Sequence, residues 1–292
     1  MDNEDENYIP YAYGLVNFTG AACWLNSMIQ SILGCSIINK ISAETPETKL
    51  SELYGIVVKK YTMQNNKEIF RLTQILLNLS DKKEVTQNVN NQNDPTEFIQ
   101  LFIEGMGSKI HDKCVHAVKS TITCGDHEHI KRDNGVLVPV ALNHINDIVG
   151  YLKYHTEELE YKCDKSNVVN SKIRLLQLSH ASEILIIMVK NYLYTNSQQN
   201  INYPRELSFN KSGGGKWVYN VMSVVEHHGI KDVNQLIASK GGGGHYTCTS
   251  KRRGKDGVIG IYNLNDSSVS LVNDFPNTPN VCLIVYSRKL ME

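Results

Sequence analysis

The sequence predicts an α+β fold in which a helical N-terminal part is followed by a sheet-rich C-terminal part. Two patterns support this prediction. Between about residues 20 and 110 the apolar side chains recur at helical spacing, and after about residue 115 they alternate or gather in short β-branched runs. The chain has 292 residues, enough to bury a large core. We therefore predict one domain over residues 14–292, helical over about 14–115 and β-rich over about 116–292, behind a flexible leader of residues 1–13.

Three helical segments are predicted in the first part. One begins at or near Cys23, because apolar residues follow it at positions 25, 28, 29, 32 and 33. A second helical pattern covers residues 50–79, and a polar, loop-like stretch follows over 81–93. A third helix starts at Asp94 with Pro95 in its first turn, where the missing N–H of proline is tolerated.

The C-terminal part contains one predicted short helix and a series of strands. Ile145–Tyr154 has the helical pattern, whereas the other segments alternate or are rich in β-branched residues. The longest strongly apolar run, Ile184–Val189, is typical of a buried strand and is far too short to cross a bilayer. The predicted strands are 135–140, 160–163, 172–178, 184–192, 217–226, 246–251, 257–263, 268–271 and 281–286.

Charge and cysteine content exclude several classes of protein. Lys plus Arg and Asp plus Glu both number 30, so the net charge of zero indicates neither a nucleic acid nor a membrane surface as partner. The first six residues are polar and acidic, unlike a signal peptide. Seven irregularly spaced cysteines do not resemble a disulfide framework, which favours a reducing cytoplasmic or nuclear compartment.

Two segments at opposite ends of the chain carry the candidate chemistry. Cys23 lies at a predicted helix N-terminus, where unpaired backbone N–H groups favour a thiolate. His245 follows the glycine run Gly241–Gly244, and a histidine is the usual base for a cysteine nucleophile. A cysteine or histidine taken alone more often has an ordinary buried or surface role. The combination indicates a cysteine hydrolase whose site is divided between two parts of the chain.

Three further polar residues could complete such a site. Asn17, shortly before the cysteine, offers an amide donor that could stabilise an oxyanion. A third residue should orient the imidazole, and either Asn265 or Asp266 could accept its N–H. The spacing does not choose between these two, because Asn-Asp-Ser-Ser is also an ordinary turn signal.

Five sequence boxes occur in a fixed order along the chain. Gly-Leu-x-Asn at residues 14–17 precedes Cys-Trp-x-Asn-Ser-x-x-Gln at residues 23–30. The other boxes are 92–98, 183–192, 221–229 with 243–247, and 261–269. Together they resemble the ubiquitin-specific proteases, a family of papain-like cysteine deubiquitinases. One box would be weak support, but five in order over residues 14 to about 286 are highly specific.

The resemblance implies a minimal catalytic domain with a helical thumb and β-rich fingers and palm. It implies thiol-dependent hydrolysis after the C-terminal Gly of ubiquitin or a ubiquitin-like modifier, by a monomer without a cofactor. Cys23 would be the nucleophile, His245 the general base and Asn265 the third catalytic residue. Asp266 would be a neighbouring support and Asn17 the oxyanion donor. The residues implied for substrate binding are Asp94, Glu97, Phe98, Gly243, Gly244 and Tyr246.

Two departures from the family pattern lie in the first two boxes. One additional residue separates Asn17 from Cys23, and Thr96 replaces the usual His of the middle box. Two alternatives stay open, the first because of these departures and the second because a glycine-lined His loop would also suit Gly-Gly sites. One is a catalytically weak or inactive ubiquitin-binding module on the same fold, and the other is a papain-like endopeptidase specific for Gly-Gly sites.

A third departure concerns zinc, which the family often binds between two Cys-x-x-Cys pairs in the fingers. Here Cys124, His127 and Cys163 occupy those places, with His129 as a possible substitute fourth ligand. Structural zinc prefers four ligands. We therefore expect fingers that fold without metal.

Overall fold

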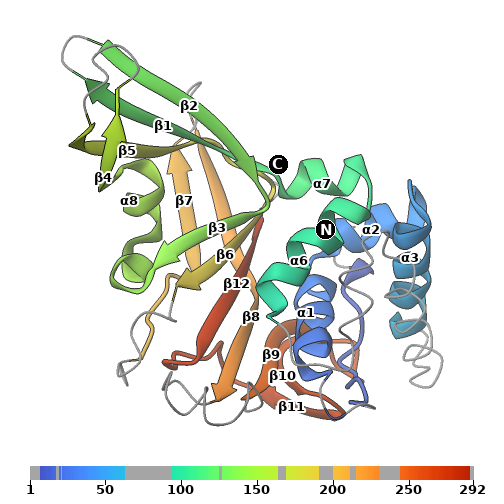
Figure 1. Ribbon diagram of the computed structural model, residues 1–292. Helices are drawn as coiled ribbons and strands as arrows, with labels where there is room; N and C mark the ends of the chain where they lie inside the picture. Colours follow the sequence, from blue (N-terminus) through green and yellow to red (C-terminus); the bar gives the residue numbers. More distant parts are fainter. Residues whose placement is uncertain are drawn as a thin grey trace.

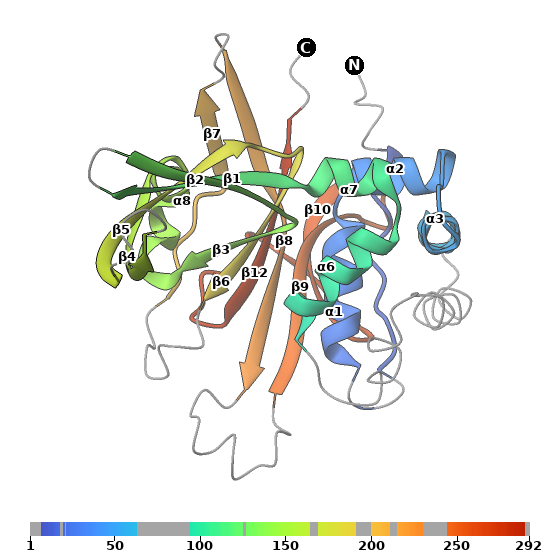
Figure 2. The same ribbon diagram turned by 45° about the horizontal axis from the view of Figure 1, so that its top comes forward.

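The computed structural model describes residues 7–17, 20, 22–62, 94–124, 127–163, 169–190, 200–210, 215–229 and 244–289. A group of helices lies beside a long sheet, and a second sheet extends from its far end (Figures 1 and 2). The α+β prediction is therefore confirmed. Within these described ranges no helix is long and apolar enough to cross a bilayer.

The helical part holds two of the predicted helices at their expected starts. The helices are α1 (Cys23–Leu33), α2 (Ser36–Glu44), α3 (Lys49–Thr62), α6 (Pro95–Gly105) and α7 (Ser108–Cys114). The predicted pattern over residues 50–79 corresponds to α3 up to Thr62, and its remainder lies outside the described residues. The short helices α2 and α7 were not predicted.

The long sheet, which corresponds to the predicted palm, has eight strands. Its order is β11-β10-β9-β8-β12-β6-β3, and β7 pairs with β8 beside this path. All pairings are antiparallel except that of β3 with β6, which is parallel. The strands are β3 (Leu137–Ala141), β6 (Ile184–Lys190), β7 (Glu206–Asn210), β8 (Lys216–Gly229), β9 (Gly244–Arg253), β10 (Ile259–Asn265), β11 (Ser268–Val272) and β12 (Val281–Arg288).

The second sheet corresponds to the predicted fingers and has four antiparallel strands in the order β2-β1-β5-β4. The strands are β1 (His116–Cys124), β2 (His127–Gly135), β4 (His155–Lys162) and β5 (Val169–His180). The 3-10 helix η2 (Leu142–Asp147) and α8 (Ile148–Lys153) replace the single predicted short helix. Strand β2 was not predicted, because it is almost entirely polar and exposed and has no apolar alternation.

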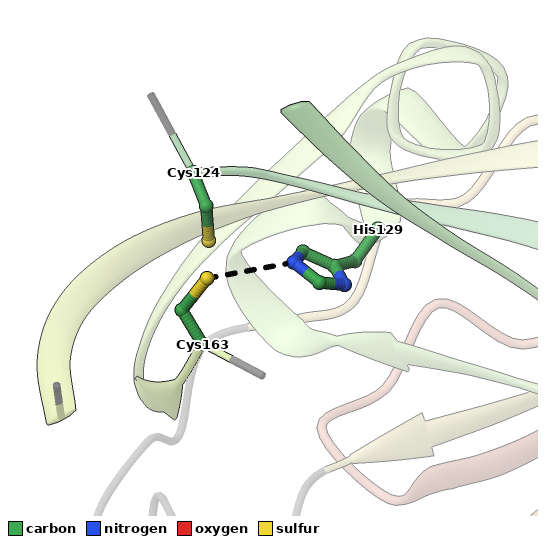
Figure 3. Close-up of side chains that lie close together, drawn as sticks. All are labelled: Cys124, His129 and Cys163. Atoms are coloured by element: carbon green, nitrogen blue, oxygen red, sulfur yellow. Dashed lines mark hydrogen bonds between the residues drawn. The ribbon is translucent and has the colours of Figure 1, made fainter. Parts of the chain in front are cut away.

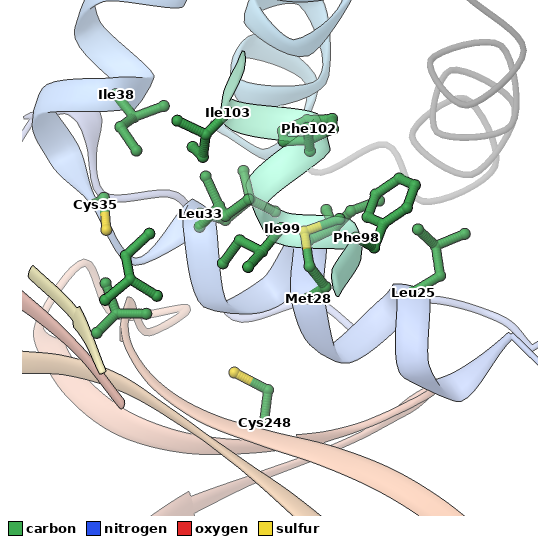
Figure 4. Close-up of a cluster of buried hydrophobic side chains, with 14 of the residues drawn as sticks. Leu25, Met28, Leu33, Cys35, Ile38, Phe98, Ile99, Phe102, Ile103 and Cys248 are labelled. Carbon is green, nitrogen blue, oxygen red and sulfur yellow. The ribbon is translucent and has the colours of Figure 1, made fainter. Parts of the chain in front are cut away.

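The largest core lies between the helices and the palm sheet, and it holds α1 in place. Every residue of α1 is buried. Its apolar side chains meet those of α6 on one side and Cys248 of β9 on the other (Figure 4). Trp24 packs edge-on against Phe98 with ring centroids 5.2 Å apart. Helix α1 therefore presents its first residue, Cys23, to the palm from a rigid support.

Residues 7–13 of the predicted leader lie against the domain. The Pro10 carbonyl accepts a hydrogen bond from Arg253 N at 3.0 Å, and Ala12 N donates to Arg253 O at 2.9 Å. Asn39 Nδ2 of α2 donates to Tyr8 O at 2.9 Å. Residues 7–13 are thus hydrogen-bonded to α2 and β9, and residues 1–6 lie outside the described residues.

Candidate active site

Cys23 is the first residue of α1 and is 1% exposed. Burial raises the pKa of its thiol. A hydrogen bond from the backbone of Tyr246 lowers that pKa, whereas the negative charge of Asp266 raises it further. The sequence predicted a thiol acidified by the helix N-terminus, but burial outweighs the backbone N–H groups. Formation of the thiolate therefore requires a base that takes the proton.

His245 lies on β9, directly before the residue whose backbone contacts Cys23. Its Nε2 atom lies 2.6 Å from Asn265 Oδ1. An amide oxygen only accepts hydrogen bonds, so Nε2 is the protonated nitrogen and Nδ1 is left as the proton acceptor. Of the two alternatives left open by the sequence, Asn265 is thus the one that contacts the imidazole. Cys23 and His245 are not hydrogen-bonded to each other within the described residues, and such sites often tighten only with substrate.

A tight turn between β10 and β11 sends two neighbouring side chains in different directions. Asn265 pairs with Ser268 across the turn, which leaves Asp266 and Ser267 as the loop. Asp266 has φ 47°, in the left-handed region that a first loop residue needs and a short Asp tolerates. Asn265 reaches His245 on the palm, while Asp266 reaches the helical part.

The Asp266 carboxylate connects two amide side chains of the N-terminal segment. Its Oδ2 accepts from Asn17 Nδ2 at 3.1 Å, and its Oδ1 accepts from Asn26 Nδ2 at 2.8 Å. Asn17 Oδ1 in turn accepts from Ala22 N, directly before Cys23, at 3.0 Å. The Asn17 amide is thus held beside the nucleophile. Asn26 was not predicted as a site residue, although its place in the Cys-x-x-Asn motif could have indicated it.

The additional residue between Asn17 and Cys23 does not detach Asn17 from the site. Asn17 keeps its hydrogen bonds to Asp266 and Ala22, although residues 18, 19 and 21 of the intervening segment lie outside the described residues. Gly14, at the start of the same box, passes the β10–β11 turn so closely that a Cβ there would lie 2.5 Å from the Ser267 carbonyl carbon. A glycine is therefore required where this segment crosses the turn.

Comparison with known proteins assigns the family. The family model described as ubiquitin carboxyl-terminal hydrolase matches residues 13–286. The chain belongs to this family. The predicted cysteine-type ubiquitin hydrolase on a papain-like fold is therefore confirmed, and neither the inactive binding module nor the endopeptidase is favoured.

Solved structures with this fold include the SAGA deubiquitinating module. The Ubp8/Sgf11/Sus1/Sgf73 module bound to monoubiquitin aligns with a TM-score of 0.70 at 17% identity, covering 96% of this chain and 70% of that one. The same module bound to ubiquitin aldehyde aligns with a TM-score of 0.65 at 17% identity, with the same coverage. No curated protein matches this hydrolase at the sequence level.

Asp94 and Phe98, both predicted to bind substrate, make contacts within the helical part of this hydrolase. Asp94 caps α6, because its Oδ1 accepts from Thr96 N at 2.8 Å and from Thr96 Oγ1 at 2.7 Å. Thr96, in the place of the family His, thereby orients Asp94. Phe98 is 5% exposed and packs on Trp24, so in this structure it belongs to the core, and its predicted contact with substrate stays a prediction. Glu97 lies in α6, and its side chain lies outside the described part of the structure.

Gly244 and Tyr246, which flank His245, both contact His227 of β8. The rings of Tyr246 and His227 stack with centroids 4.4 Å apart. A Cβ at Gly244 would lie 2.2 Å from His227 Nε2. A side chain at position 244 would therefore have to displace the His227 ring, so Gly244, which the sequence analysis assigned to the substrate channel, also packs against His227. Gly243, the other predicted channel residue, lies outside the described residues.

Three potential zinc ligands converge at the end of the fingers sheet (Figure 3). The ligand atoms of Cys124, His129 and Cys163 all lie within 4.8 Å of one another. His127, which the sequence analysis placed in this group, is not a member of it in the described part of the chain, and His129 takes that place. Two thiols and an imidazole are donors that suit zinc, so these residues fit the metal that the family often carries.

Proposed function

We propose that Cys23, His245 and Asn265 form the catalytic centre of this deubiquitinase. The observation that carries the proposal is the 2.6 Å contact between His245 Nε2 and Asn265 Oδ1. His245 lies on β9, and the backbone of the next residue, Tyr246, hydrogen-bonds to Cys23. One hairpin and one helix end thus bring together a nucleophile, a base and the group that orients the base.

In the first half of the reaction, His245 Nδ1 takes the proton of the Cys23 thiol. The thiolate sulfur attacks the carbonyl carbon of the terminal Gly of ubiquitin, and the carbonyl oxygen becomes an oxyanion. Asn265 stabilises the imidazolium through its side-chain oxygen. The imidazolium then protonates the leaving amine as the C–N bond breaks, which leaves a thioester on Cys23.

In the second half, His245 removes a proton from water as the water oxygen attacks the thioester carbon. The C–S bond breaks, the proton returns to the sulfur and ubiquitin leaves with a free carboxylate. We propose Asn17 as an oxyanion donor in both halves. Support comes from its hydrogen bonds to Ala22 N and Asp266, which hold its amide beside the nucleophile.

We propose further that this reaction needs no cofactor, because the nucleophile and base are both side chains of the chain itself. Ubiquitin and its conjugates are the proposed partners, in the cytoplasm or nucleus, with the protein acting as a monomer. The described residues contain seven free cysteines, which supports a reducing compartment. Solved structures that share this fold are bound to ubiquitin, which supports ubiquitin as the proposed partner.

The test is reaction with ubiquitin that carries a C-terminal electrophile. We expect a covalent adduct of one ubiquitin per chain, absent in Cys23→Ala and retained in Cys35→Ala, which removes another buried thiol. Probes built on other ubiquitin-like proteins, run in parallel, measure which modifier is preferred. An adduct that survives in Cys23→Ala, or none with the unaltered protein, would contradict the proposed nucleophile. Binding of the probe without an adduct would favour the inactive binding module.

A further inference from the structure

Strand β11 is the outermost strand of the palm sheet, at the bottom of the view in Figure 1. Within the described residues it is paired only with β10, so its other side is a free edge. Free edges invite pairing with a further strand, and proteins usually protect them with charges or proline. The five residues of β11 include no charge and no proline. The other described edge strands carry such residues, namely Glu128 and Lys131 on β2, Pro139 on β3, Glu158 and Glu160 on β4, and Glu206 on β7.

The register of the β10–β11 hairpin determines which backbone groups of β11 face outward. Asn265 and Ser268 flank the two-residue loop, and a pair in this position exchanges both of its backbone hydrogen bonds. Bonded and non-bonded pairs alternate along an antiparallel ladder, so Ser270 also bonds to β10, whereas Val269 and Leu271 do not. The N–H and C=O groups of Val269 and Leu271 therefore point to the free edge, with the spacing that a further β-strand requires.

The side chains of the same two residues form an apolar strip beside this edge. Val269 is paired with Leu264, which is 2% exposed, and it packs against the largest core. Leu271 lies on the same face, because side chains alternate along a strand, and it is 67% exposed. An antiparallel strand at the edge would place its own side chains directly beside Val269 and Leu271. Apolar residues at those positions would cover Leu271.

The size of this edge indicates which kind of partner fits it. Stable protein–protein interfaces bury about 1,200–2,000 Å², to which five residues with one exposed apolar side chain contribute too little. A second copy of the chain is therefore not favoured. A single extended segment needs no larger surface, because its backbone hydrogen bonds supply affinity and its alternate side chains supply specificity. The absence of charge on β11 favours a segment that is itself uncharged.

The position of β11 beside the catalytic centre indicates the source of this segment. Strand β11 follows the β10–β11 turn directly, and Asn265 at the start of that turn contacts His245. An extended chain spans about 3.3 Å per residue, so a lysine a few residues from a segment on β11 lies within reach of the catalytic centre. We propose that β11 binds an extended, uncharged segment of the ubiquitin-conjugated protein, with apolar residues opposite Val269 and Leu271. This inference rests on the proposed function and adds a determinant of which conjugates are cleaved.

The first experiment measures peptide binding to the whole chain by fluorescence anisotropy. The probe is a labelled, capped Thr-Val-Thr-Val-Thr peptide, and Thr-Asp-Thr-Asp-Thr is its control. Leu271→Lys, which puts a charge beside the edge, should weaken binding of the valine peptide by about tenfold or more. Val258→Lys is the matched control variant, because Val258 is 64% exposed but lies outside β11. It should leave binding within about twofold.

The second experiment shows whether the peptide pairs with β11 as a strand. Saturating valine peptide should slow hydrogen exchange at the amides of Val269 and Leu271 by about tenfold or more, and leave the amides of β12 unchanged. N-methylation of both peptide valines should abolish binding, whereas N-methylation of the central threonine should not, because only the valine N–H groups face β11. Absence of binding, equal binding to Leu271→Lys and Val258→Lys, or unchanged exchange at Val269 and Leu271 would overturn the docking strand.

The third experiment tests whether the segment belongs to the conjugated protein. Ubiquitin is joined by an isopeptide bond to a lysine that precedes either the valine or the aspartate peptide. The valine conjugate should have a kcat/KM higher by about fivefold or more, a preference lost in Leu271→Lys and kept in Val258→Lys. If the free valine peptide instead alters hydrolysis of ubiquitin that carries a small leaving group, the edge serves a regulator and the proposal is wrong. Binding and exchange are also measured in Cys23→Ala, so loss of the adduct at Cys23 and loss of docking at β11 are observed separately.

Discussion

Replacement of Gly244 by alanine tests whether His227 determines the geometry of the catalytic strand. The new Cβ would lie 2.2 Å from His227 Nε2, whereas ordinary contacts begin at 3.4 Å. The imidazole or the strand must therefore move by about 1.2 Å, the difference between these distances. The ring cannot move freely, because it is stacked on Tyr246 at 4.4 Å.

The expected cost follows from this displacement. Overpacking a filled site costs about 1–3 kcal/mol in stability. A shift of about 1 Å in a catalytic group costs about 100-fold in rate, which corresponds to about 2.7 kcal/mol. His245 is the next residue along the chain, so we expect Gly244→Ala to lower kcat/KM by about 10- to 100-fold.

The assay is hydrolysis of a fluorogenic ubiquitin substrate, with denaturant unfolding measured in parallel. Removal of the ring in the double variant Gly244→Ala with His227→Ala should recover most of the loss that Gly244→Ala causes. Gly135→Ala is the matched control, because its Cβ would meet nothing closer than 3.6 Å. If the double variant is no more active than Gly244→Ala, the glycine is needed by the substrate and the reasoning from His227 is refuted.

Three further predictions concern stability and the polar network. Burial, and then the charge of His180, lowers the pKa of His116 from 6.5 to about 4, so the folded state resists protonation. The contribution of neutral His116 to the free energy of unfolding is therefore complete above about pH 6.5 and should fall by about 3 kcal/mol as the pH is lowered to 4. Denaturant titration at several pH values should show a smaller pH dependence in His116→Gln. Asp266→Ala and Asn17→Ala should each lower kcat by about 100-fold, and the double variant by little more, because both changes break one network. Arg252→Ala should cost about 3–5 kcal/mol in chemical unfolding, because it leaves a cavity and removes the donor to the buried backbone and side-chain oxygens of Gln30 in α1.

Elements with strong apolar periodicity could be predicted from the sequence. Helix α1 begins at Cys23 and α6 at Pro95, as their spacing and capping residues indicated. Strand β2 could not be predicted, because its pairing with β1 supplies the backbone hydrogen bonds while its side chains remain polar and exposed. Helix α2 was missed because it is short and only a few of its residues are buried.

Site residues within a sequence motif could be predicted. Residues whose contacts depend on local packing could be predicted less well. Nothing in the residue pattern itself ranked Asn265 above Asp266, because the choice depends on the backbone conformation of a two-residue loop. Phe98 belongs to a family box but packs in the core, since boxes record structural as well as chemical constraints. The choice of His129 over His127 depends on how the side chains of one strand face Cys163 across the sheet, which spacing does not encode.

The β10–β11 turn also couples the two lobes of the enzyme mechanically. Through one residue, Asp266, the palm bonds Asn17, Asn26 and the backbone of Leu15, all in the N-terminal segment. The preceding residue of the same turn holds the imidazole. A movement that separated the thumb from the palm would therefore release Asn17, the proposed oxyanion donor, and disturb His245, the proposed base, in a single event. On the proposed mechanism, closure of the two lobes is therefore a condition for catalysis.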